Sequence, residues 1–110
     1  MKKLFLKDSV KINGRHFDYE IRCMLDVARE TAPELKDQCV WVTSANDSKH
    51  KNNSLHYKDS AFDIRVINVI GGNEEIEKWV EKIKLELGKD YDVIFEHNPP
   101  HLHLEFDPKV

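Results

Sequence analysis

Apolar residues recur at helical spacing in two segments of the chain. The first segment runs from Phe17 toward Pro33, a residue that prevents much continuation of a helix. The second runs from Asn73, which can cap a helix, to Gly88, a natural C-terminal stop. The expected buried stripes are Ile21, Met24, Leu25 and Ala28 in the first helix, and Ile76, Trp79, Val80, Ile83 and Leu87 in the second. The glutamates and lysines of the second segment are expected on its solvated face.

Other segments show the composition and alternation of strands. Strands are expected at Val40–Thr43, Ala61–Val69, Tyr91–Phe95 and 102–106, with a long polar loop after the first and an irregular connection at 97–100. The order is helix, strand, loop, strand, helix, strand, strand. It predicts an α+β domain in which the helices pack on one face of a mainly antiparallel sheet.

The alternation also predicts which polar residues point away from the core. Phe62, Ile64 and Val66 take the buried face of their strand, so Asp63 and Arg65 share the other face. Leu102, Leu104 and Phe106 are the apolar positions of the last strand. His101, His103 and Glu105 are therefore expected to point together toward solvent.

Composition limits the classes of protein that fit this pattern. The chain has 110 residues, and its 17 basic and 20 acidic residues give a net charge of −3, so we expect a single domain with no general attraction to nucleic acid or to anionic membranes. No stretch is long and apolar enough to span a membrane, and the apolar run at 4–6 is too short for a signal peptide. Cys23 and Cys39 are expected to be free thiols, because their spacing fits neither a zinc knuckle nor a redox motif.

Metal-binding residue types gather where the pattern predicts loops and solvent-facing strand positions. Four of the six histidines lie there together with two carboxylates: His50, His56, His101, His103, Asp63 and Glu96. Zinc binds imidazole nitrogen and carboxylate oxygen, and a catalytic zinc keeps three protein ligands and one open position. Two histidines and one aspartate satisfy that requirement, so the sequence predicts a metal site.

The spacing of His56 and Asp63 requires a turn between them. A fully extended chain would hold the two residues roughly 23 Å apart, but the segment 57–60 contains turn-forming Asp and Ser. The third ligand must come from elsewhere, and His101 or His103 can supply it. The other histidine of that pair is then free for the substrate or the transition state.

These motifs resemble a known family. The segments 42–50 and 53–65, with His-x6-Asp, and 91–96 and 101–108, with His-x-His, resemble the zinc D-Ala-D-Ala peptidases, in particular their small phage-type members. That family comprises zinc carboxypeptidases and endopeptidases that cut bacterial cell-wall peptides, and the hedgehog signalling domain shares its fold. The resemblance implies a hedgehog/DD-peptidase-like fold, a bound Zn²⁺ and a role in peptidoglycan cleavage.

The resemblance also implies roles for single residues. His56 and Asp63 match the first two zinc ligands of the family, and His103 matches the third. His101 matches a neighbouring histidine that assists near the metal. Glu96 is the best match to the general base, because it ends the strand that precedes the His-x-His motif.

The sequence departs from the family in two places. The interval 97–100 is longer than usual, so Glu105 is the reserve candidate for the base. No arginine stands at 44–46, where many members bind the substrate carboxylate. Arg65 shares the face of Asp63 and is an alternative carboxylate contact, equally compatible with a supporting or surface role. Ser54 and His50 match family positions near the site and are expected to hold the loop or contact the substrate.

The resemblance therefore implies a zinc-dependent peptidase that hydrolyses stem or cross-link peptides of peptidoglycan, as a D-Ala-D-Ala carboxypeptidase or an endolysin-type endopeptidase. We expect a monomer made in the cytoplasm that reaches the cell wall after phage-type release, or within a virion. The alternative is a non-catalytic, zinc-containing module that binds the wall or a protein, such as a virion component. The presence of Glu96 and His101 favours the peptidase, since a binding module needs neither residue.

Overall fold

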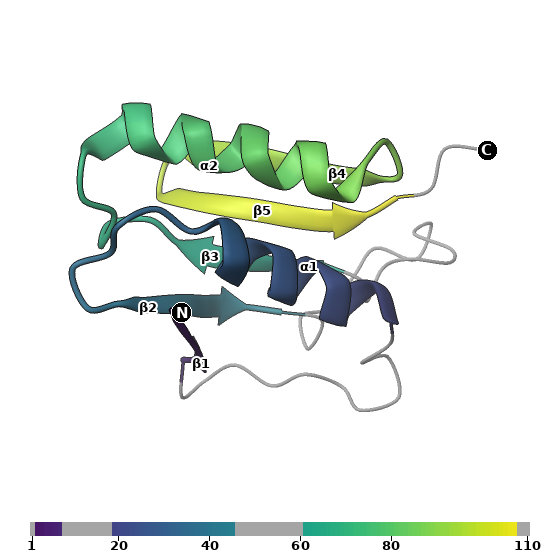
Figure 1. The fold of residues 1–110 in the computed structure, drawn as a ribbon, viewed down its shortest axis with the longest axis horizontal. Helices are drawn as coiled ribbons and strands as arrows, with labels where there is room; N and C mark the ends of the chain where they lie inside the picture. The colour runs from purple at the N-terminus through teal and green to yellow at the C-terminus, as the bar shows by residue number, and fades with distance from the viewer. Residues whose placement is uncertain (1, 8–18, 46–60, 108–110) are drawn as a thin grey trace.

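A five-stranded mixed sheet carries two helices on one of its faces. The computed structural model describes residues 2–7, 19–45 and 61–107. Its elements are β1 (Lys3–Leu6), α1 (Tyr19–Thr31), β2 (Cys39–Ser44), β3 (Ala61–Arg65), α2 (Gly72–Leu87), β4 (Tyr91–His97) and β5 (Pro100–Phe106). The strand order is β1-β2-β3-β5-β4, with β1 parallel to β2 and the other neighbours antiparallel (Figure 1). The α+β class and the element order are confirmed, and β1 is a strand that the pattern did not predict.

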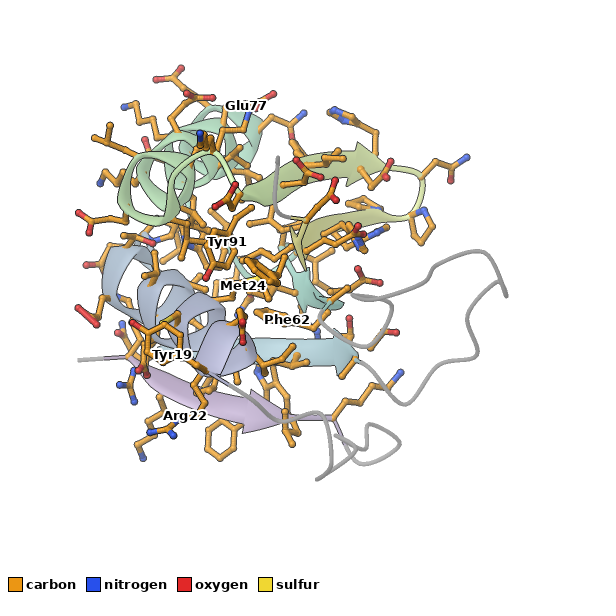
Figure 2. All side chains as sticks on the ribbon, turned by 90° about the vertical axis from the view of Figure 1, so that its right-hand side faces the viewer. Tyr19, Arg22, Met24, Phe62, Glu77 and Tyr91 are labelled. Atoms are coloured by element: carbon orange, nitrogen blue, oxygen red, sulfur yellow. The ribbon has the colours of Figure 1, made fainter. Side chains whose placement is uncertain are left out.

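The core lies between the two helices and the sheet. Met24 of α1 is directed toward Phe62 of β3, whereas Glu77 of α2 points away from the sheet (Figure 2). Trp79 is 1% exposed, and its indole Nε1 donates a hydrogen bond of 3.1 Å to the carbonyl oxygen of Ala28. That bond joins the helices and satisfies the polar atom that burial of the tryptophan would otherwise leave unpaired. Both apolar stripes therefore cover the same face and leave the other face open.

The start of α2 and the end of β3 differ from the pattern. The cap of α2 is Gly71, with φ of 104° and no side-chain hydrogen bond, so the cap expected at Asn73 is wrong. A side chain at position 71 would place its Cβ 2.5 Å from Glu75 Cγ, which explains why glycine occupies this turn. β3 ends at Arg65 and not at Val69, because Val69 N donates to the carbonyl oxygen of Val66 and closes a turn. Gly88 does end the helix.

The connection between β4 and β5 is a tight hairpin where an irregular segment was expected. Only Asn98 and Pro99 separate the strands, and the peptide bond between them is cis. His97 pairs with Pro100, and Glu96 with His101. The hairpin therefore brings the two strand ends that carry the predicted catalytic residues directly opposite each other.

The described part of the chain agrees with two further expectations. Cys23 and Cys39 are free cysteines, half-buried and buried respectively. No helix within these ranges is long and apolar enough to cross a membrane.

Candidate functional site

Strand register brings the predicted site residues onto the open face of the sheet. Asp63 of β3 pairs with His103 of β5, and Arg65 pairs with His101. Glu96 of β4 pairs with His101 from the other side. The neighbouring positions on β3 and β5 are buried toward the helices, so these five side chains lie on the opposite face. The face predicted from the alternation is confirmed for Asp63, Arg65, His101 and His103, and the pairing with His101 places Glu96 on the same face.

Asp63, His103 and Glu105 form a hydrogen-bonded chain on this face. His103 Nδ1 lies 2.8 Å from Asp63 Oδ1, and His103 Nε2 lies 3.1 Å from Glu105 Oε1. Carboxylates only accept hydrogen bonds when ionised, so both ring nitrogens donate when the imidazole is protonated. The hydrogen bond to Asp63 is the largest cause of a pKa for His103 raised to about 9, with Glu105 contributing and partial burial opposing. In the metal-free chain His103 is therefore a cation near neutral pH.

This shift predicts how the stability of the metal-free protein depends on pH. A histidine whose pKa rises on folding contributes stability that is complete below its unfolded value of about 6.5 and is lost as pH passes through about 9. The quantity to compare, with chelator present, is the difference in the free energy of unfolding between the wild type and His103→Gln. This difference should be larger at pH 6 than at pH 10 by about 1–3 kcal/mol. Urea titrations at the two pH values measure the difference. A wild-type advantage that does not change with pH would contradict the assigned chain.

The ring of His101 has a defined tautomer. Its Nδ1 lies 2.7 Å from the carbonyl oxygen of Pro99, which can only accept, so Nδ1 carries a proton. Its Nε2 lies 3.9 Å from Asp63 Oδ1. In neutral His101, Nε2 therefore offers a lone pair beside Asp63, and only the doubly protonated ring can donate a hydrogen bond from this atom.

The two candidates for the general base occupy different surroundings. Glu105 is engaged by His103 Nε2 and so acts as an orienting partner of that ring. Glu96 is exposed and lies directly across from His101, where paired side chains have Cβ atoms about 4.5–5.5 Å apart. Two strand spacings, roughly 10 Å, and two residues along the strands separate its backbone from Asp63 on β3, so Glu96 adjoins His101 and not Asp63.

An aromatic row holds Arg65 beside the histidines. The guanidinium carbon of Arg65 lies 5.1 Å from the centre of the Trp41 ring, whose other neighbour is Phe5 at 5.1 Å. Trp41 Nε1 donates a hydrogen bond of 2.7 Å to Asp37, and the pKa of this carboxyl is lowered first by a hydrogen bond from Asn68 and second by the one from Trp41. Stacking on a fixed indole ring positions the guanidinium at little entropic cost. The sequence pattern predicted only that Trp41 belongs to a strand, and it did not predict its contact with Arg65.

A groove with a volume of about 360 Å³ adjoins these residues. Its lining residues are Thr43, Asp63, Arg65, Ile67, Pro99, Pro100 and His101. A larger hollow of about 600 Å³ lies between the end of α2 and β4. The described lining of that hollow includes no histidine, so the smaller groove is the one joined to the candidate site.

The donor set at Asp63 and His103 fits a zinc ion. Two ligands at 2.0–2.2 Å in tetrahedral geometry lie about 3.4 Å apart, so the 2.8 Å pair needs to open only slightly to receive an ion. The hydrogen bond from the other ring nitrogen to Glu105 is the arrangement found behind zinc-bound histidines. Loss of the ring proton on binding would free Nδ1 as a ligand. His56, the third predicted ligand, lies outside the described residues, as do His50 and Ser54.

A second group of potential ligands was not predicted. Oxygens of Asp92, Glu105 and Asp107 converge within 4.8 Å of one another. Three carboxylates suit a hard cation such as Ca²⁺ more than zinc, and such groups are common on protein surfaces without any ion. The open face of the sheet thus carries the predicted site and, sharing Glu105 with it, an acidic cluster.

The chain was compared with protein families, curated proteins and solved structures. No protein-family model, no curated protein and no solved structure matches this chain. The site must therefore be interpreted from its own geometry and from the sequence motifs.

Proposed function

We propose that this protein is a zinc-dependent peptidase that hydrolyses peptides of bacterial peptidoglycan. The observation that carries the proposal is the chain from Asp63 through His103 to Glu105, in which one imidazole nitrogen faces a carboxylate ligand and the other is held by a second carboxylate. The groove beside the chain offers access for a peptide. The choice of peptidoglycan rests on the resemblance at 42–65 and 91–108.

Asp63 and His103 would hold the ion together with His56. Bound zinc would supply a Lewis acid that polarises the scissile carbonyl and lowers the pKa of water toward about 7. Glu105 keeps the ring of His103 oriented by accepting the hydrogen bond from Nε2. The hydrogen bond to Glu105 fixes the orientation of the His103 ring, so that Nδ1 is directed toward Asp63.

Glu96 is the proposed general base. Its exposed carboxylate can take a proton from the attacking water and return it to the leaving amine. His101 is held by Pro99 with Nε2 toward the site, and in its doubly protonated form it can donate a hydrogen bond to the developing oxyanion. The two groups face each other across neighbouring strands, so Glu96 can accept the proton of the attacking water while His101 donates to the carbonyl oxygen of the same peptide bond.

Arg65 is the proposed contact for a substrate carboxylate. The described residues offer it no ion pair, and it lines the same groove as Asp63 and His101. A planar guanidinium binds a carboxylate through two parallel hydrogen bonds. A peptide anchored there would have its neighbouring carbonyl close to the candidate ligands.

Mass spectrometry of digested peptidoglycan tests the proposal. Purified sacculi incubated with the zinc-loaded protein should release new amino termini or free D-Ala, chelator should stop the release, and added zinc should restore it. The mass of the products identifies the bond. Sacculi that sediment with the zinc-loaded protein yet stay uncut for hours would contradict the peptidase and favour a binding module.

A further inference from the structure

The outer side of β4 is a long edge with which no described strand pairs. β4 ends the strand order and spans seven residues, whereas β1, at the other end, spans four. Its register with β5 runs without a bulge from Tyr91 to His97, and no proline interrupts it. Prolines and bulges are devices that stop a further strand from adding to an edge. The edge of β4 therefore remains able to accept an extended chain.

The hydrogen-bond pattern identifies the backbone groups on this edge. Asp107 N donates a hydrogen bond of 2.7 Å to the carbonyl oxygen of Asp90, one pair beyond the register of β4 with β5. In an antiparallel ladder, alternate pairs exchange both hydrogen bonds, so the even-numbered residues of β4 bond to β5. The N–H and C=O groups of Val93 and Phe95 therefore point to the free side, where an added strand would meet them.

The hollow of about 600 Å³ between the end of α2 and β4 adjoins this edge. α2 packs along β4 (Figure 1). The apolar lining of the hollow comes from Leu85, Tyr91, Val93 and Ile94. Leu85 is 86% exposed, whereas Val93 is 3% exposed because its side chain faces the helices. A residue paired with Val93 would direct its side chain to the same side of the sheet, into the hollow and against Leu85.

Two lysines give one end of the hollow a positive charge. Lys84 lies in the last turn of α2, and Lys89 lies between α2 and β4. Within the described ranges Lys89 has no ion pair, and Lys84 has an exposed one of 3.8 Å with Glu81. Both lysines lie near the N-terminal end of β4, so an antiparallel strand would reach them with its C-terminal residues. Acidic residues at that end would complement the charge of the hollow.

We propose that the outer edge of β4 binds an extended segment of a partner protein, which adds antiparallel to β4 with an aliphatic side chain in the hollow and acidic residues beside Lys84 and Lys89. Backbone hydrogen bonds would supply affinity, and the side-chain contacts would supply selectivity. A second copy of the chain fits less well, because pairing all of β4 with itself would set Asp92 opposite Glu96 at both ends. β5 separates this edge from β3, so the proposal does not depend on the peptidase.

Binding of a designed peptide tests the edge. The probe is acetyl-Thr-Ile-Leu-Thr-Glu-Glu-amide, whose third residue pairs with Val93 and whose neutral fourth residue stands opposite Asp92. NMR of the ¹⁵N-labelled full chain measures hydrogen exchange of single amides. At a peptide concentration of about ten times Kd, exchange at Val93 and Phe95 should slow about tenfold, because only the free protein exposes these groups. Exchange at Ile94, which already bonds to β5, should change much less.

Two N-methylated peptides test the register. Methylation of the third peptide nitrogen removes the donor that faces the carbonyl oxygen of Val93. Binding should weaken about 5- to 100-fold, the loss expected when a carbonyl is left unpaired in the interface. The second peptide nitrogen points away from β4, so its methylation should be tolerated. Equal effects of the two methylations would overturn the strand addition.

The chain supplies a matched control for the charged end. Lys89→Gln should weaken binding of the probe about two- to fivefold, as expected for one exposed ion pair, and should leave unchanged the binding of a peptide with Gln in place of both Glu. Lys82→Gln should have no effect, because Lys82 is exposed on α2 but does not line the hollow. Equal effects of the two changes would contradict the acidic partner.

Two further results would overturn the proposal. The first is a probe that fails to bind at millimolar concentration, or that binds without slowing exchange at Val93. The second is a free protein that sediments as a dimer and already protects the Val93 amide, since a second copy would then occupy the edge.

Discussion

Replacement of Asp63 by asparagine is expected to remove zinc from the protein and with it all peptidase activity. Asparagine keeps the size of the side chain but not its charge, so position 63 would offer zinc a neutral amide oxygen, which is a weaker ligand than the carboxylate that lies 2.8 Å from His103 Nδ1. We expect about one zinc per wild-type chain after dialysis against a weak chelator, and less than about a tenth of that for the variant. Elemental analysis measures both.

Asp92→Asn is the matched control for this change. Asp92 is a carboxylate on the same open face, on β4, but it pairs with Glu105 and not with His103. The control should keep its zinc and its activity on peptidoglycan. Equal zinc content in Asp63→Asn and the wild type would remove Asp63 from the ligand set and with it the observation on which the proposed function rests.

Glu96→Gln is expected to keep zinc and fold but to lower the turnover of wall peptides about 10²- to 10⁴-fold. This is the usual contribution of a positioned acid–base group, and the exposed position of Glu96 implies little structural cost. The measurement is kcat on a synthetic stem peptide, with zinc content determined on the same sample.

Glu105→Gln provides the contrast. Because Glu105 accepts the hydrogen bond from His103 Nε2, its loss should weaken zinc binding about 10- to 100-fold, and saturating zinc should restore much of the activity. The two variants therefore separate catalysis from ligand support. An active Glu96→Gln together with a zinc-loaded but inactive Glu105→Gln would exchange the two roles.

Local patterns in the chain were enough to predict the class of fold and one face of the site. Period-2 alternation depends only on the geometry of an extended backbone. It therefore placed Asp63 and Arg65 on the solvent-facing side of β3, and His101 and His103 on the solvent-facing side of β5. The apolar stripes of both helices followed from the helical period in the same way. The prediction of a helix cap at Asn73 was wrong because two glycines with positive φ precede this residue. The conformation of such a turn depends on the residues that pack around the turn.

Strand order and register came only from the tertiary structure. The sequence predicted that His103 faces solvent, but the pairing of His103 with Asp63, distant in the chain, results from β5 lying between β3 and β4. The same pairing makes Glu105 a partner of His103 and leaves Glu96 as the freer carboxylate. By itself the sequence determined the helices, most strands and the face of the polar residues on β3 and β5, because these depend on neighbours a few positions apart. Which side chains share a groove, an ion or a proton depends on long-range pairing, which is decided by how the whole sheet and its helices bury their apolar faces together.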